Sequence, residues 1–225
     1  MSIYKKYLGS DFEKLHPKMQ QRFSMSSENE LAIIGTGKME RIWNAGFHVL
    51  PFLHFGTRRN IMFPESGKNI PFSIENYAYK DRFGRETVTW IRQFHFAKKK
   101  RRFDATMIFS EKENRIVDYL GNKQHLAVDI DMKVNPDGSV TIKSGNQRFY
   151  EGPAAFKFPE MFSGNAEVNE FYDEAADLFR ISVKVSNQTF GAIFGYNGYF
   201  KAEFKHVKPE EIPAYAKPLR EENRE

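Results

Sequence analysis

A period of two in the alternation of apolar and polar side chains is the feature that most constrains how this chain can fold. The pattern first appears from Leu31 to Trp43 and returns repeatedly between Ile70 and His206. Successive side chains of a β-strand point to opposite faces, so each run predicts a half-buried strand. The later runs lie at 70–79, 86–96, 101–110, 115–120, 125–134, 139–150, 166–172, 178–186 and 199–206.

Short polar turns separate these runs. Residues 81–84 end in Gly, and residues 135–138 read Asn-Pro-Asp-Gly, which are typical sequences of tight hairpin turns. No intervening segment is long enough for the helical crossovers of a parallel sheet, so an antiparallel meander is favoured. We predict an α+β, mainly β fold: a strongly curved antiparallel meander or open barrel of about nine to ten strands.

Two segments depart from the strand period. Residues 10–23 predict an N-terminal helix, with Ser10 and Glu13 in capping-box spacing, which is either continuous or interrupted and restarted at Pro17. Residues 46–64 are rich in Phe and follow neither period cleanly. They predict a short Phe-rich helical segment covering an opening, or alternatively a plain connection within the core.

The length and the absence of certain residues limit the class of protein. We expect a single globular domain over residues 1–207, and an extended, partly disordered tail over 208–225, where three prolines precede a charged end. The chain has no Cys, which excludes disulfides and a thiolate nucleophile. Charged side chains interrupt residues 1–15, which excludes a signal peptide there, and the most apolar stretch, residues 47–55, is too short for a membrane span, so we expect a cytoplasmic protein. The oligomeric state is not predicted.

The net charge of +5 is concentrated in one region. Residues 1–112 carry 20 basic and 11 acidic side chains, a net +9, whereas the remainder carries 14 and 18, a net −4. Much of the excess lies in the run Lys98 to Arg102, which is either a phosphate-binding patch or a solvated hairpin tip. No groove-reading helix or exposed aromatic platform accompanies it, so we predict no specific nucleic-acid partner.

Arginines interrupt the apolar rows of three predicted strands. Arg92 shares a face with Trp90 and Phe94, Arg41 shares one with Trp43, and Arg148 shares one with Tyr150. A lone charge in an apolar interior is too costly to keep, so each arginine must be paired, reach solvent or face a ligand anion.

Two interpretations of these arginines stay open. Carboxylates in or beside strands could make them ordinary ion pairs: Asp104, Asp118, Glu151 and Glu170. Alternatively, the 22 Phe of the chain enclose a mostly aromatic cavity with arginine at its polar end, suited to a small apolar or amphipathic molecule without any cofactor. The predicted ligand-binding residues are Arg41, Trp43, Phe52, Trp90, Arg92, Phe94, Arg148 and Tyr150.

Catalytic signatures are weak. The six His residues are scattered and predict no metal site, and neither a nucleophile elbow nor a phosphate-binding glycine loop occurs. The alternative function is a metal-independent enzyme of the isomerase or cyclase type, with Asp104, Asp118 or His125 as base. A third hypothesis is weak binding to an anionic surface through residues 98–102.

Several segments together resemble a known family. They are residues 34–43, 84–87, 101–105, 117–121, 147–152 and 194–198. In this order they are similar to an uncharacterised bacterial domain-of-unknown-function family, found as stand-alone proteins in spore-forming Gram-positive bacteria. Similar domains also occur fused behind saccharopine-dehydrogenase-like reductase domains. The resemblance implies no defined activity, and the fused arrangement implies that a small organic molecule is involved.

Overall fold

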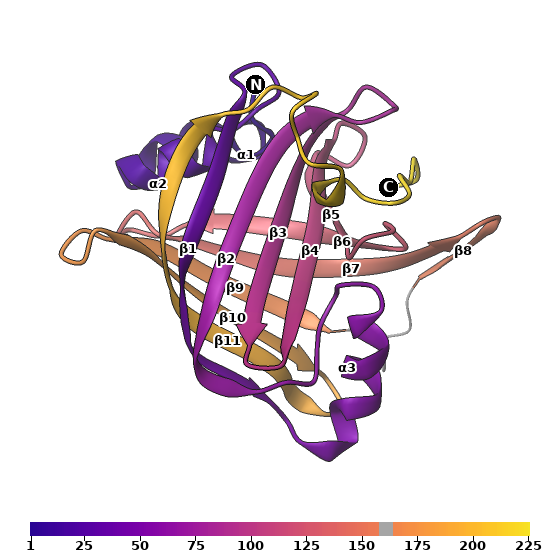
Figure 1. Ribbon diagram of the computed structural model, residues 1–225. Helices are drawn as coiled ribbons and strands as arrows, with labels where there is room; N and C mark the ends of the chain where they lie inside the picture. Colours follow the sequence, from indigo (N-terminus) through magenta and orange to yellow (C-terminus); the bar gives the residue numbers. More distant parts are fainter. Residues whose placement is uncertain (158–163) are drawn as a thin grey trace.

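The computed structural model describes residues 1–157 and 164–225, and these form a closed antiparallel β-barrel (Figure 1). Neighbouring strands of the barrel follow the chain order, and the antiparallel pairing of the first strand with the last completes the ring. The barrel strands are β1 (Leu31–Asn44), β2 (Gly67–Lys80), β3 (Glu86–Phe96), β4 (Lys99–Ser110), β5 (Arg115–Leu120), β6 (Leu126–Val134), β7 (Val140–Glu151), β9 (Asn165–Asp173), β10 (Leu178–Asn187) and β11 (Gly191–His206). Strand β8 (Ala154–Lys157) pairs with β7 outside the ring. The predicted mainly β fold with about ten antiparallel strands is confirmed, and the barrel is closed.

Short helices at the N-terminus fill one end of the barrel. They are α1 (Ile3–Leu8), the 3-10 helix η1 (Gly9–Lys14) and α2 (Pro17–Phe23). The interrupted alternative is therefore the one observed, because Pro17 begins α2 at a position where its missing N–H costs no hydrogen bond. The predicted start at Ser10 is wrong, since Ser2 caps α1 through a hydrogen bond from the Tyr4 N–H. Tyr4 and Phe23 are completely buried under the barrel strands.

The predicted short helix within residues 46–64 is present at the other end of the barrel. The 3-10 helix η2 (Phe47–Val49) leads into α3 (Leu50–Thr57), which lies beside the lower ends of β3 and β4 in Figure 1. Leu53 is the buried apolar side chain on the inner face of α3. Within the described ranges, no helix has the length and apolar character needed to cross a membrane.

Strand irregularities in β1 and β7 change which of the predicted site residues face the interior. In β1, Met39 lies opposite Gly198 but Arg41 lies opposite Asn197, so Glu40 is an extra residue. Between β6 and β7, Val128 lies opposite Gln147 and Ile130 lies opposite Ser144. One residue of β6 therefore faces two residues of β7, Gly145 and Asn146, so β7 has one extra residue. Because side chains alternate along a strand, each extra residue reverses the orientation of all those beyond it.

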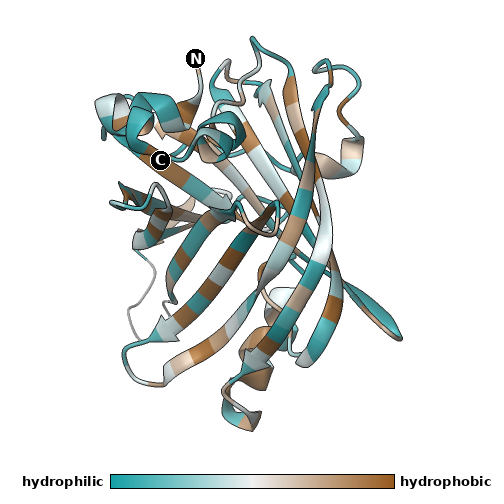
Figure 2. Cartoon of the chain, turned by 90° about the vertical axis from the view of Figure 1, so that its left-hand side faces the viewer, coloured by the Kyte–Doolittle hydropathy of each residue, from teal (hydrophilic) through white to brown (hydrophobic). Residues whose placement is uncertain are grey.

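Part of the outer face of β2 and β3 is apolar, and the C-terminal tail covers it. Bands of apolar and polar residues alternate along the strands in Figure 2. Ile212 and Ala216 of the tail, the latter in the 3-10 helix η4 (Ala214–Ala216), pack against an outer cluster that includes Tyr77 and Tyr79. The tail thus lies against the barrel along residues 208–225, an arrangement that its proline content did not predict.

Candidate functional site

A cavity of about 250 Å³ lies inside the barrel. This exceeds the roughly 150 Å³ that admit a benzene ring in an apolar protein interior. Its wall is mostly apolar and comes from the inner faces of β3 to β7, β9 and β10. The main apolar wall residues are Trp90, Phe103, Met107, Leu120, Leu126, Val128, Ile130, Ile142, Phe149, Ala166, Val168, Val183 and Val185.

The two ends of the cavity differ. At the inner end, Trp90 packs against Tyr4 and Phe23 of the N-terminal helices, with ring centroids 6.4 and 6.2 Å away. At the other end, Phe52 and Phe55 of α3 line the cavity. Phe55 is also 69% exposed, so the cavity reaches the molecular surface beside α3.

Asp118 is an acidic side chain within this apolar wall. It lies on the inner face of β5, between Ile116 and Leu120, and is only 6% exposed. Among the described residues, its Oδ1 has no hydrogen-bond partner and its carboxyl group forms no ion pair. Burial raises the pKa of Asp118 to about 7, although the charge of Arg92 and the backbone N–H of Thr106 act in the opposite direction. The protonation state of Asp118 therefore changes near neutral pH.

Arg92 supplies a positive charge to the same cavity. On the inner face of β3 it is 5% exposed, and its Nε donates to the Phe103 carbonyl oxygen at 3.2 Å. Its Nη1 donates to the Tyr196 hydroxyl, also at 3.2 Å, and the guanidinium lies 4.2 Å from the centre of the Phe103 ring. No carboxylate of the described residues forms an ion pair with it. The cavity thus holds a buried cation and a buried acid that are near each other but not directly paired.

Three of the eight predicted ligand-binding residues line this cavity: Phe52, Trp90 and Arg92. Phe94 points into the barrel but is not part of the cavity wall. It packs against Phe63, Phe72 and Tyr196 at centroid distances of 4.8 to 5.2 Å.

The structure places the other four residues on the outside of the barrel. Arg41 and Trp43 follow the extra residue in β1, and Trp43 lies over the backbone of Gly195. Arg148 and Tyr150 follow the extra residue in β7, and Arg148 donates to Asp129 at 2.6 Å. The expectation that these four residues share faces with the inward apolar rows is wrong, because simple alternation takes no account of the extra residue in each of the two strands.

The three candidate bases occupy different places. Asp118 lies in the cavity, as described. Asp104 faces outward on β4, where Arg102 Nη2 is 2.9 Å away and the Asn60 amide donates to it at 2.7 Å. Burial raises the pKa of the Asp104 carboxyl, and Arg102 opposes that shift. Asp104 therefore belongs to an ion pair outside the cavity.

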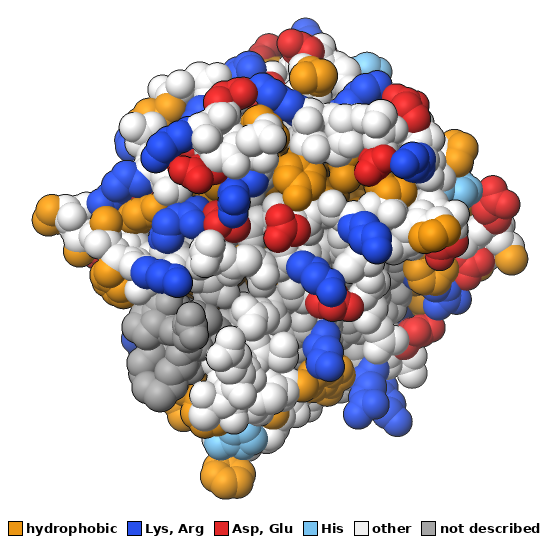
Figure 3. Space-filling view, turned by 180° about the vertical axis from the view of Figure 1, so that it is seen from behind, with side chains coloured by type: hydrophobic (Ala, Val, Ile, Leu, Met, Phe, Trp, Pro, Cys, Tyr) orange, Lys and Arg blue, Asp and Glu red, His pale blue; other side chains and the backbone are white. Residues whose placement is uncertain are grey.

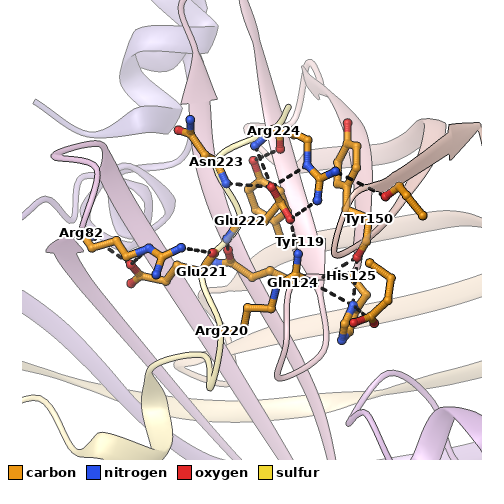
Figure 4. Close-up of polar contacts among 12 residues, drawn as sticks. Arg82, Tyr119, Gln124, His125, Tyr150, Arg220, Glu221, Glu222, Asn223 and Arg224 are labelled. Carbon is orange, nitrogen blue, oxygen red and sulfur yellow. Dashed lines mark hydrogen bonds and ion pairs between the residues drawn. The ribbon is translucent and has the colours of Figure 1, made fainter.

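His125 lies at the rim of the cavity, where the C-terminal tail meets the loop between β5 and β6 (Figure 4). Its Nδ1 is 2.9 Å from the Tyr150 carbonyl oxygen and 2.8 Å from the carboxylate of Glu151. Arg220 of the tail and Arg59, which follows α3, contact the ring nitrogens at 2.9 and 3.2 Å. These contacts tie the rim to both segments, so His125 is largely occupied by structural partners.

A buried carboxylate joins neighbouring residues of the tail. Glu222 interacts with the guanidinium groups of Arg220 and Arg224, and its backbone N–H donates to the Gln124 side chain at 2.6 Å (Figure 4). Hydrogen bonds from Arg224, together with the charges of both arginines, lower the pKa of Glu222 to about 2. In the described part of the chain, no group of three or more His, Asp or Glu side chains could hold a metal ion.

Other cavity residues were not predicted from the sequence. Gln147 and Phe149 face inward only because of the bulge in β7, so simple alternation assigns them to the wrong side. Arg59 and Lys123 line the mouth from loops, where no periodicity applies. Asp118 did have a signal, since it alternates with Ile116 and Leu120.

Comparison with known proteins gives a consistent family match. Residues 15–200 match the family model described as domain of unknown function DUF4166. The chain is also 37% identical over 202 residues to the uncharacterized protein YndH of Bacillus subtilis (strain 168), an alignment that covers 90% of this chain and 97% of the relative.

Proposed function

This chain belongs to the DUF4166 family of domains of unknown function, and we propose that its barrel binds a small, mainly apolar molecule that carries an acidic group. One observation carries the proposal: Arg92 and Asp118 both face the cavity, both are buried, and neither has an ion-pair partner among the described residues. Domains of this kind fused behind saccharopine-dehydrogenase-like reductases, as the resemblance implies, would fit a small organic ligand.

The chemistry of the two side chains defines the ligand class. A buried guanidinium is costly unless it is compensated, and a carboxylate, phosphate or enolate would compensate Arg92 with charge-assisted hydrogen bonds. Asp118 in its protonated form would donate a hydrogen bond to the same acidic group. The apolar wall would surround the remainder of the ligand, whose burial supplies most of the affinity.

Octanoate and octan-1-ol form a matched pair of probes for this proposal. Trp90 lines the cavity whereas Trp43 lies outside, so the fluorescence of a Trp43→Phe protein reports on the cavity. We expect octanoate to change this fluorescence at lower concentration than octan-1-ol. In this background, Arg92→Gln should weaken octanoate binding about tenfold or more, since hydrogen bonds to charged groups contribute about 1.5–3 kcal/mol.

Arg41→Gln is the matched control, because Arg41 lies on the outer face of β1. It should bind octanoate like the parent protein. Arg92→Lys keeps the charge and checks that any loss does not come from misfolding, which circular dichroism also monitors. Equal binding of acid and alcohol, or an Arg92→Gln protein that binds octanoate normally, would contradict the proposal.

Octanoate binding should also depend on pH. Octanoate stays ionised between about pH 6 and pH 8, whereas Asp118 loses its proton near pH 7. Above that pH the cavity would have to hold two negative charges, so affinity should fall by up to about tenfold per pH unit. Asp118→Asn should remove this pH dependence. Titrations of both proteins at several pH values test it, and parallel curves would show that Asp118 does not face the ligand.

A second candidate function is metal-independent catalysis of the isomerase or cyclase type. The observation that favours it is the pKa of Asp118 near 7, which suits a general acid or base at neutral pH, beside Arg92, which could stabilise an enolate. In deuterated water, exchange of the protons next to the carbonyl of 2-oxooctanoate, followed by nuclear magnetic resonance, would reveal proton abstraction. We expect acceleration by the parent protein and none by Asp118→Asn; no acceleration by either would leave binding as the function.

A further inference from the structure

Large apolar side chains project from the end of the barrel where the cavity opens. Phe47 is 85% exposed, and the other members of this group are exposed to a smaller degree. The rings of Phe47 and Phe190 lie 6.0 and 6.2 Å from the His48 ring, which joins the β10–β11 turn to η2. We call the group the mouth patch; its members are Phe47, Phe52, Phe55 and Phe190.

Positively charged side chains lie at the same end of the barrel as the mouth patch. Residues 44–64 contain no Asp or Glu but include Arg58 and Arg59. The β3–β4 hairpin lies at the same end of the barrel, because Glu65 pairs with Arg101 at 2.5 Å and with Lys99 at 3.7 Å (Figure 1). Its tip leaves Lys98, Lys99 and Lys100 exposed, as predicted for a solvated hairpin.

The back of the molecule carries charges of both signs. On the back of the molecule, Lys and Arg side chains are interspersed with Asp and Glu (Figure 3). Hydrophobic side chains project at the lower end in the same view. Exposed aromatic groups flanked by cations are the combination that binds the interface of an anionic bilayer.

We propose that the mouth patch and the surrounding cations dock the protein on an anionic lipid surface, with the cavity mouth toward the lipid. This rests on the proposed function, because the docking would let an apolar acid pass between the bilayer and the cavity without crossing water. The rings of Phe47 and Phe190 are exposed to solvent outside the cavity, which favours a deformable lipid surface over a protein partner. The proposed binding partner of the mouth patch is thus a bilayer rich in anionic phospholipid.

Co-sedimentation with vesicles tests the docking. We expect binding to vesicles of phosphatidylcholine and phosphatidylglycerol in equal parts, and much weaker binding to phosphatidylcholine alone. The double variant Phe47→Ser, Phe190→Ser changes patch residues that do not line the cavity. It should bind anionic vesicles about tenfold more weakly or worse. Phe171→Ser is the matched control, since Phe171 is comparably exposed on β9 but lies toward the opposite end of the barrel.

The cationic contribution requires a separate variant. Replacement of Lys98, Lys99 and Lys100 by Ser should weaken binding to anionic vesicles by about fivefold per lysine at low salt, and much less at high salt. It should leave the residual binding to neutral vesicles unchanged. An equal loss on both kinds of vesicle would contradict an electrostatic role for this hairpin.

The outcomes separate the docking from the proposed function. Arg92→Gln should lose octanoate binding but keep vesicle binding, and the double Phe variant should show the reverse. A protein that binds octanoate but no vesicles overturns the docking alone. If sedimentation velocity instead shows a dimer that the double Phe variant abolishes, and no vesicle binding, the patch is an interface between two copies and the inference is wrong.

Discussion

Replacement of Glu170 by Ala should destabilise the protein by about 3–5 kcal/mol, because it leaves the guanidinium of Arg22 buried without its counter-charge. Both side chains are completely buried. Arg22 interacts with the Glu170 carboxylate through Nε and Nη2 and donates from Nη1 to the Asn76 side chain at 2.8 Å. Trp90 and Phe200 lie against the guanidinium at 4.9 and 5.1 Å, so water has no access to replace the lost carboxylate.

Urea denaturation followed by circular dichroism measures this effect. The matched control is Glu167→Ala on the same strand, whose exposed carboxylate contacts Lys143 and Asn169 and should contribute within about 0.5 kcal/mol. The double replacement Arg22→Met, Glu170→Leu should recover most of the stability, since it removes both buried charges at similar volume. If Glu170→Ala resembles Glu167→Ala, the pair does not hold α2 to β9.

Replacement of Asp118 by Asn should stabilise the protein, and more so at high pH. The pKa of Asp118 is raised in the folded protein to about 7, from about 3.9 when unfolded. Between these values the folded state binds more protons than the unfolded state, so the free energy of unfolding falls as pH rises through this window. Above pH 7 this loss of unfolding free energy is complete and is on the order of a few kcal/mol.

The comparison requires unfolding curves at about pH 4 and pH 8. The free energy of unfolding of Asp118→Asn should exceed that of the parent protein by a few kcal/mol at the higher pH and by much less at the lower pH. Asp131→Asn on β6 is the control, because Asp131 is exposed. Parallel pH profiles for the parent and Asp118→Asn would contradict a buried, unpaired Asp118. A stabilising substitution at a cavity residue is the pattern expected where function opposes stability.

Strand alternation was sufficient to predict a strongly curved antiparallel meander, because most neighbouring strands pair through short local turns, but it did not predict that the barrel closes. The same alternation failed beyond Glu40 and around Gly145 and Asn146, where one extra residue reverses every later side chain. A bulge depends on the partner strand as well as on the bulged strand, so a local pattern does not locate it. This is why Arg92 was placed correctly while Arg41 and Arg148 were not.

Long-range pairing was also beyond the sequence patterns. Glu170 was recognised as a possible partner for an arginine, but its actual partner, Arg22, is 148 residues away on a helix. The contacts of the tail with the β5–β6 loop, such as that of Glu222 with Gln124, likewise connect distant parts of the chain. Asp118 was a candidate from its strand face alone, but its lack of an ion-pair partner among the described residues emerges only when all neighbouring strands are in place.

A crystal structure of the protein with octanoate tests the central claim most directly. We predict electron density for an elongated molecule inside the barrel, with its carboxylate within hydrogen-bond distance of the Arg92 guanidinium and the Asp118 carboxyl group. The hydrocarbon chain should point toward Phe52 and Phe55 at the mouth. A barrel interior filled by its own side chains, or octanoate bound only on the outer surface, would contradict the account.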